Sequence, residues 1–80
     1  MGHAQRGPKR LAEKLLQIRK SLEVSQREMA QRLRMDVSAN SISKYERGKT
    51  KPTLRVLLAY ARIGKVSMAQ IVDDEEDLSI

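Results

Sequence analysis

The chain has 80 residues, the length of one small domain with a thin hydrophobic core. It contains no Cys, which excludes disulfides, thiolate metal ligands and thiol nucleophiles and suits a reducing cytoplasm. No apolar run approaches the roughly 18 residues that span a bilayer, so we expect no membrane partner. Met1-Gly2-His3 has the look of an expression scar and is left out of the fold prediction.

The charge is unevenly distributed along the chain. All 16 Lys and Arg lie between Arg6 and Lys65 with only five acidic residues among them, an excess of eleven positive charges. The other five acidic residues are consecutive, at 73–77. This pattern indicates a polyanionic partner such as nucleic acid, although a soluble basic surface would carry the same charge. Two Tyr, no Phe and no Trp disfavour binding of single strands by base stacking.

An arm and an amphipathic helix are predicted for the first part of the chain. Residues 1–8 end at Pro8, and we expect a flexible arm there. A helix is predicted from Lys9 to about Leu22, with Lys14 off its buried face. Steps of four, three and four residues, the helical period, separate the apolar residues Leu11, Leu15, Ile18 and Leu22.

Two short helices separated by a turn are predicted next. Ser25 lies three residues before Glu28, the spacing of a capping box at a helix start. The turn at 34–37 follows, and Ser38 is a candidate N-cap for a third helix over about 39–47. The residues expected to face the core are Met29, Ala30, Leu33, Ile42 and Tyr45.

The remaining sequence predicts two further helices. Gly48 stands where a left-handed residue ends the third helix, Thr53 caps a fourth helix, and Ser67 caps a fifth that ends at Val72. The acidic residues and those that follow them, 73–80, are expected to be frayed. One face of the fourth helix is expected to carry Leu54, Leu57, Leu58 and Ala61.

Several short motifs in this order resemble the Cro/C1-type (XRE) helix-turn-helix family of phage repressors and bacterial regulators. They are Ser25-Gln26 with Met29-Ala30, Ile42-Ser43, Glu46-Arg47-Gly48, Pro52 and Val66-Ser67. The resemblance implies an all-α, compact five-helix bundle of the lambda-repressor-like type over 9–72, between the arm and an acidic C-terminal tail at 73–80.

The chain departs from the family pattern at three places. Glu23 occupies a position where the family often has Gly, and a left-handed residue other than Gly costs about 1 kcal/mol. The turn between the second and third helices is two residues longer than usual, which affects the pose of the third helix. Gly64-Lys65 stands where Leu-Gly is more common, so we expect an irregular end to the fourth helix.

The resemblance implies sequence-specific binding to double-stranded DNA, with the third helix in the major groove. Exposed base-reading candidates at its start are Ala39, Asn40, Ser43 and Lys44. The base-reading positions of the family fall on Ala39, Asn40 and Lys44. Asn40 can pair with adenine and Lys44 can donate to guanine, whereas Ala39 can only pack against a thymine methyl. The alternatives are a capping role for Asn40 and a solvated Lys44.

A second group of residues is expected to contact phosphates, which supplies affinity without sequence information. It consists of Gln26, Ser38, Ser41, Arg47, Lys49, Thr50 and Lys51. In the family the residue that matches Gln26 holds a phosphate and braces the third helix. Arg6, Lys9 and Arg10 are candidates for an arm that follows the DNA backbone. Any of the Lys and Arg residues expected to contact phosphates could instead be a surface charge with no role in binding.

The resemblance also implies an ion pair and a dimer. Arg19 and Glu46 match residues that the family often joins by a partly buried ion pair, which would tie the first helix to the third. Specificity requires two subunits on a palindromic operator, hence a homodimer. The candidate interface is Val56, Tyr60, Ile63, Val66, Met68, Ile71 and Val72, although the same residues could fill the chain's own core.

The predicted function is that of a transcriptional repressor or autoregulator in a bacterial or phage-infected cytoplasm. The alternative is a protein-interaction module, such as an antitoxin or adaptor, with the acidic run at 73–77 docked on a basic partner or mimicking DNA. An enzyme, a cofactor and a metal site are not expected, because the only His is His3 and no phosphate-binding glycine loop occurs.

Overall fold

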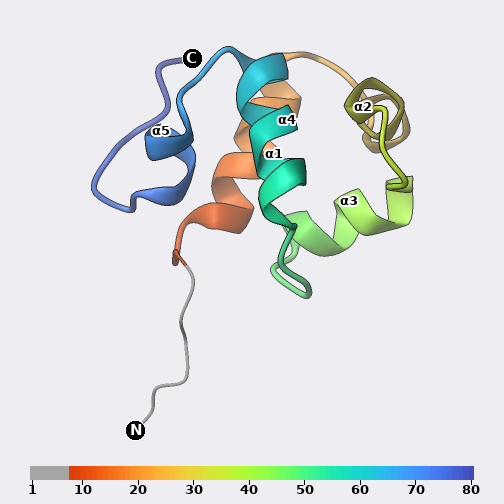
Figure 1. Cartoon of the computed structure of the whole chain (residues 1–80), viewed down its shortest axis with the longest axis horizontal. Helices are drawn as coiled ribbons and strands as arrows, with labels where there is room; N and C mark the ends of the chain where they lie inside the picture. The colour runs from red at the N-terminus through yellow and green to blue at the C-terminus, as the bar shows by residue number, and fades with distance from the viewer. Residues whose placement is uncertain (1–7) are drawn as a thin grey trace, which may run out of the picture.

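A computed structural model describes residues 8–80, which fold into five helices. The helices are α1 (Leu11–Ser21), α2 (Gln26–Leu33), α3 (Ala39–Glu46), α4 (Leu54–Gly64) and α5 (Met68–Val72) (Figure 1). No strand occurs between residues 8 and 80, and the all-α prediction is confirmed. The predicted arm up to residue 7, with Arg6, lies outside the described residues.

The starts of α2, α3, α4 and α5 follow from local side-chain chemistry. Ser25, Ser38, Thr53 and Ser67 each accept a hydrogen bond from the backbone N–H three residues ahead, at 3.0, 3.1, 3.3 and 3.1 Å. At α2 the capping box is complete, because Glu28 Oε1 also accepts from the Ser25 N–H at 3.0 Å. Each cap satisfies an otherwise free donor and stabilises the helix by about 1 kcal/mol.

Three of the five helices, α1, α2 and α4, are followed by a left-handed residue other than glycine. Glu23 has φ +58°, as its position predicts, and Lys65 also has φ +58°. Gly64 is the last residue of α4 but does not take the left-handed conformation, which falls on Lys65. A Cβ at Gly64 would lie 2.8 Å from Cγ2 of Ile18, so glycine is needed there for the close approach of α4 to α1.

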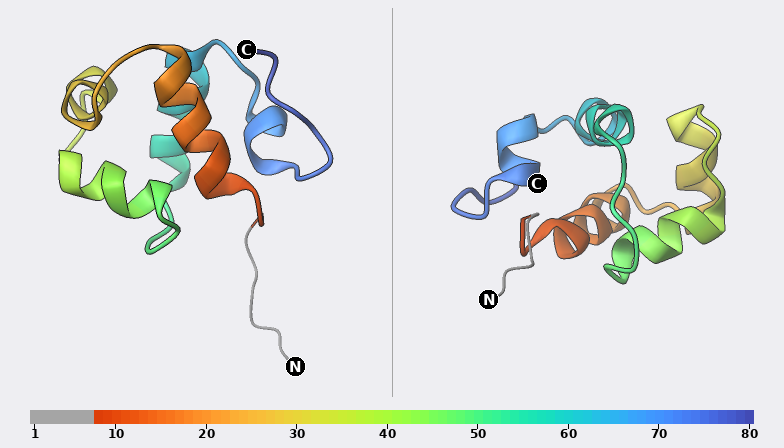
Figure 2. Two further views of the ribbon diagram at one scale, coloured as in Figure 1. Left: turned by 180° about the vertical axis from the view of Figure 1, so that it is seen from behind. Right: turned by 60° about the horizontal axis from the view of Figure 1, so that its bottom comes forward.

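The helices pack around one core in which α1 and α4 are central. α2 and α3 lie on one side of this pair, and α5 contacts α1 and α4 on the other side (Figures 1 and 2). The fully buried side chains come from all five helices and include Leu15, Ile18, Met29, Ile42, Tyr60 and Ile71. A core that draws on every helix holds α3 at a fixed angle to α1 and α4.

The buried face of α4 differs from the prediction. Leu54 and Leu58 are 64% and 42% exposed, whereas Val56 and Ala59 are buried. Apolar residues surround most of this helix, so helical periodicity alone does not choose the face. Packing against α1 and α2 determines which face of α4 is buried.

The predicted dimer surface is wrong for three of its members. Val56, Tyr60 and Ile71 are buried in the chain's own core. Burial raises the pKa of the Tyr60 hydroxyl well above its ordinary value. The other members pack partly against the core; they are Ile63, Val66, Met68 and Val72. A domain this small needs these side chains to complete its own core.

The C-terminal segment is docked on α1, so the expectation of a frayed end is wrong. Lys14, predicted to lie off the buried face, is fully buried. Its Nζ donates to the carbonyl oxygens of Gln70, Asp73 and Glu76 at 2.7, 2.8 and 2.7 Å. Leu78 packs against the core beyond these contacts. The segment therefore belongs to the folded domain.

Asp74 caps α1 from a distance in sequence. Its carboxylate accepts hydrogen bonds from the backbone N–H groups of Lys9 (2.8 Å) and Arg10 (3.1 Å). Arg10, the N-cap residue of α1, supplies no side-chain cap of its own. These two hydrogen bonds hold the pKa of Asp74 below its ordinary value.

Acid is expected to weaken this cap. Because the pKa of Asp74 is lower in the folded chain, its charged form stabilises the fold above the ordinary carboxyl pKa. This contribution is lost as the pH falls below that value and through the folded pKa. In urea unfolding between pH 6 and pH 2.5, Asp74→Asn should lose less stability on acidification than wild type. Parallel pH profiles would contradict the cap.

Candidate nucleic-acid interface

The start of α3 is open to solvent. Asn40 and Lys44 are exposed, while Ala39 and Ser43 are half-buried. Asn40 and Lys44 lie on the side of α3 away from Ile42, which is fully buried, whereas Ala39 precedes Ile42 by three residues and lies nearer the buried face. Asn40 and Lys44 are thus the two most accessible of the four predicted residues.

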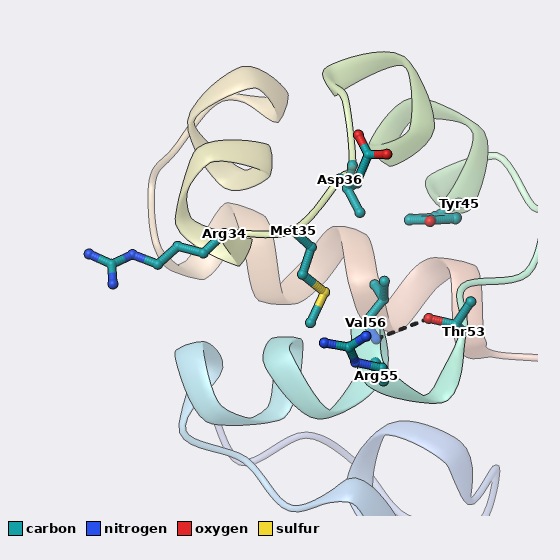
Figure 3. A pocket seen from close by; sticks show the side chains of 8 residues that line it. Arg34, Met35, Asp36, Tyr45, Thr53, Arg55 and Val56 are labelled. Carbon is teal, nitrogen blue, oxygen red and sulfur yellow. Dashed lines mark hydrogen bonds between the residues drawn. The ribbon is translucent and has the colours of Figure 1, made fainter.

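The lengthened turn before α3 does not cover this surface. Met35 and Val37 turn inward and pack against the core. A cavity of about 300 Å³ lies beside the turn, with Tyr45 of α3 and Val56 of α4 also in its lining (Figure 3). Arg34 extends away from the other labelled side chains (Figure 3). The turn at 34–37 therefore forms a wall of this cavity and leaves the N-terminal turn of α3 free.

A chain of polar contacts holds α3 against α1 and α2. Arg19 Nε donates to Glu46 Oε2 at 2.7 Å, and Arg19 Nη2 donates to Glu46 Oε1 at 3.1 Å. Gln26 Nε2 donates to the same Oε1 at 3.0 Å. Arg19 Nη1 also donates to the Val24 carbonyl oxygen at 3.0 Å. These contacts fix the orientation of α3 from both neighbouring helices.

The Arg19–Glu46 ion pair implied by the family resemblance is present and partly buried. The two side chains are 16% and 5% exposed. The paired carboxylate raises the pKa of Arg19 above its ordinary value. A bidentate pair shielded from water has a more definite geometry than a surface pair.

Cations and hydroxyls lie at both ends of α3. Five of the predicted phosphate-contacting residues are exposed: Ser38, Arg47, Lys49, Thr50 and Lys51. Gln26 and Ser41 are half-buried, and Gln26 is engaged with Glu46. Gly48 has φ +72°, which turns the chain out of α3 into the loop that carries Lys49 and Lys51. The surface can therefore offer several positive charges to one anionic partner.

Other kinds of site find little support in the described part of the chain. Between residues 8 and 80, no three His, Asp or Glu side chains converge where a metal ion could sit. None of the helices is long and apolar enough to cross a membrane.

Comparison with known proteins agrees with this geometry. The family profile described as helix-turn-helix matches residues 15–71, most of the chain. The chain belongs to the Cro/C1-type helix-turn-helix family. Its fold is similar to that of the P22 c2 repressor protein, solved in complex with the synthetic operator 9T in the presence of Tl⁺. The TM-score is 0.71 at 26% sequence identity, over 80% of this chain and 94% of that chain. No curated protein matches in sequence.

The comparison confirms the predicted lambda-repressor-like, five-helix fold of this helix-turn-helix protein. The sequence interpretation missed the contacts among Arg10, Lys14 and the acidic segment, which join residues more than 50 positions apart. One signal was present, since Lys14 lies three residues after Leu11 and four before Ile18, on the edge of the apolar stripe.

Proposed function

We propose that this helix-turn-helix protein binds double-stranded DNA in a sequence-specific manner and acts as a transcriptional repressor or autoregulator. The observation that carries the proposal is the accessible N-terminal turn of α3, a helix whose last residue, Glu46, is held by Arg19 and Gln26. A rigidly held helix end with polar tips can enter the major groove and contact base edges. The similarity to a repressor solved with its operator supports the same class of function.

Within this proposal, residues on α3 contact bases and those around it contact phosphates. Asn40 pairs with adenine N6 and N7, and Lys44 donates to guanine O6 or N7. Ala39 and Ser43, which are less exposed, pack beside them. Phosphate contacts come from the cations and hydroxyls of 47–51, from Ser38 and Ser41, and from the N-terminal end of α2 at Gln26.

Two copies of the chain are proposed to bind one palindromic operator in the cytoplasm. One recognition helix contacts only a few base pairs, so two half-sites about 34 Å apart supply the specificity. Four members of the predicted interface keep part of their surface accessible for such a contact; they are Ile63, Val66, Met68 and Val72. The buried residues Val56, Tyr60 and Ile71 have no role in it.

Two variants distinguish base contacts from phosphate contacts. Asn40→Ala should weaken binding to the preferred duplex by about 1–3 kcal/mol and relax the preference at one base position. Lys49→Ala should weaken binding to all duplexes about equally and reduce the slope of log affinity against log salt by about one. Fluorescence anisotropy titrations over a range of salt concentrations measure both effects.

Wild-type protein is the reference for this experiment, and thermal unfolding of each variant is its control. If Asn40→Ala weakens all duplexes equally, the proposed base contact is wrong. If wild type has negligible affinity for duplex DNA even at low salt, the DNA-binding function is wrong, and the interaction-module alternative takes its place.

A further inference from the structure

The N-terminal end of α1 is an anion-binding site that the chain fills with its own acidic segment. The Asp74 carboxylate accepts from the backbone N–H groups of Lys9 and Arg10. Arg10 Nη2 donates to Asp77 Oδ1 at 2.9 Å, and Arg10 Nη1 donates to the Asp74 carbonyl oxygen at 3.0 Å. Free N–H groups at a helix start and a guanidinium are the groups that bind phosphate oxygens.

This end of α1 adjoins the loop that we propose contacts DNA. Lys9 at the start of α1 and Thr50 and Lys51 of the loop line one cavity of about 370 Å³. Figure 1 shows the first turn of α1 and the loop between α3 and α4 at the same end of the molecule. A DNA backbone that extends past the loop as far as Lys9 would therefore bring phosphates to the start of α1, where Arg10 is the next residue.

We propose that the acidic segment Asp73–Asp77 is an internal competitor that lowers the affinity of the domain for DNA. The segment occupies the start of α1 and pairs with Arg10, which would otherwise add a phosphate contact. It also places the Asp74 carboxylate at the backbone of Lys9, a residue that lines a cavity with Thr50 and Lys51 of the basic loop, and this negative charge repels phosphates. This inference rests on the proposed DNA-binding function and adds regulation of the same surface.

The competitor is anchored independently of its pairing with Arg10. Lys14 holds the segment through three backbone carbonyl oxygens, and none of these contacts needs the Asp77 side chain. The Arg10–Asp77 ion pair is exposed, at 36% and 84%, and such pairs add little stability. Asp77→Asn should therefore remove the counter-charge of Arg10 and leave it only the carbonyl oxygens of Asp74 and Glu76, while the segment stays docked and the domain stays folded.

Glu75→Gln provides the matched control. It removes the same single negative charge from the same segment, and within residues 8–80 the Glu75 side chain makes no ion pair. With a fluorescent duplex of arbitrary sequence, Asp77→Asn should bind about five-fold more tightly than wild type, with a salt slope steeper by about one. Glu75→Gln should bind less than about two-fold more tightly, because only long-range repulsion is reduced.

Arg10→Gln, introduced into wild type and into the Asp77→Asn variant, completes the test. In wild type this change should alter affinity little, since Arg10 is already paired. In the Asp77→Asn background it should remove the whole gain. Equal gains in DNA affinity for Asp77→Asn and Glu75→Gln, or no gain for either, would overturn the proposal that the segment competes with DNA. They would leave the DNA-binding function itself intact. Failure of wild type to bind any duplex would instead reject the proposed function itself.

Discussion

Replacing Glu46 with Ala is expected to lower the free energy of unfolding by about 3 kcal/mol. The Glu46 carboxylate accepts two hydrogen bonds from Arg19 and one from Gln26, and its side chain is only 5% exposed. Removing it leaves the guanidinium of Arg19 partly buried without its counter-charge, which costs more than the pair contributes. For a domain of this size the melting temperature should fall by about 10 °C or more.

Glu13→Ala serves as the control, because Glu13 is an exposed acidic residue of α1. Its effect on the free energy of unfolding should be within about 0.5 kcal/mol of zero. Differential scanning calorimetry of both variants measures the comparison. Equal, small losses for the two variants would show that the Arg19–Glu46 pair does not stabilise the fold.

Replacing Lys14 with Met is expected to have a second large effect, a loss of about 3 kcal/mol. Met has a similar length and can fill the same space, but it has no donor for the carbonyl oxygens of Gln70, Asp73 and Glu76. These acceptors would lose a charged partner, and an unsatisfied buried acceptor is costly. We therefore expect the segment after α5 to detach from α1.

Lys20→Met is the matched control, since Lys20 is exposed on the same helix. Amide hydrogen exchange followed by NMR reports the detachment directly, because protection at residues 73–78 should fall in Lys14→Met and persist in Lys20→Met. If Lys14→Met kept both the wild-type melting temperature and this protection, the three carbonyl contacts would not hold the segment.

The starts of four of the five helices were predictable because they depend on residues close in sequence. Ser25, Ser38, Thr53 and Ser67 each lie three residues before the N–H group from which they accept, so a short window of sequence contains both partners. The left-handed Glu23 is equally local.

Features that depend on distant parts of the chain were not predictable in this way. Packing against α1 and α2 determines which face of α4 is buried. Val56, Leu58 and Tyr60 are all apolar, so their residue types do not predict which of them is buried. The burial of Lys14 depends on backbone carbonyls 56 to 62 residues away. A lysine in a helix is ordinarily exposed, so composition and period gave the opposite expectation.

The candidate interface combines both kinds of information. The identity and order of its residues came from the family resemblance, whereas their accessibility depends on where the longer turn lies. Met35 and Val37 pack inward, and that packing keeps Ser38 and Asn40 at the surface. No local sequence pattern in 34–37 predicts that the turn packs inward and does not cover the start of α3.

The central claim, that α3 recognises bases in double-stranded DNA, is tested most directly by selecting bound duplexes from a random pool. We expect wild type to enrich a palindrome whose half-sites are about one helical turn apart. Asn40→Ala should enrich a motif that has lost its preference at one base of each half-site. No enriched motif for wild type, or an unchanged motif for Asn40→Ala, would contradict the account.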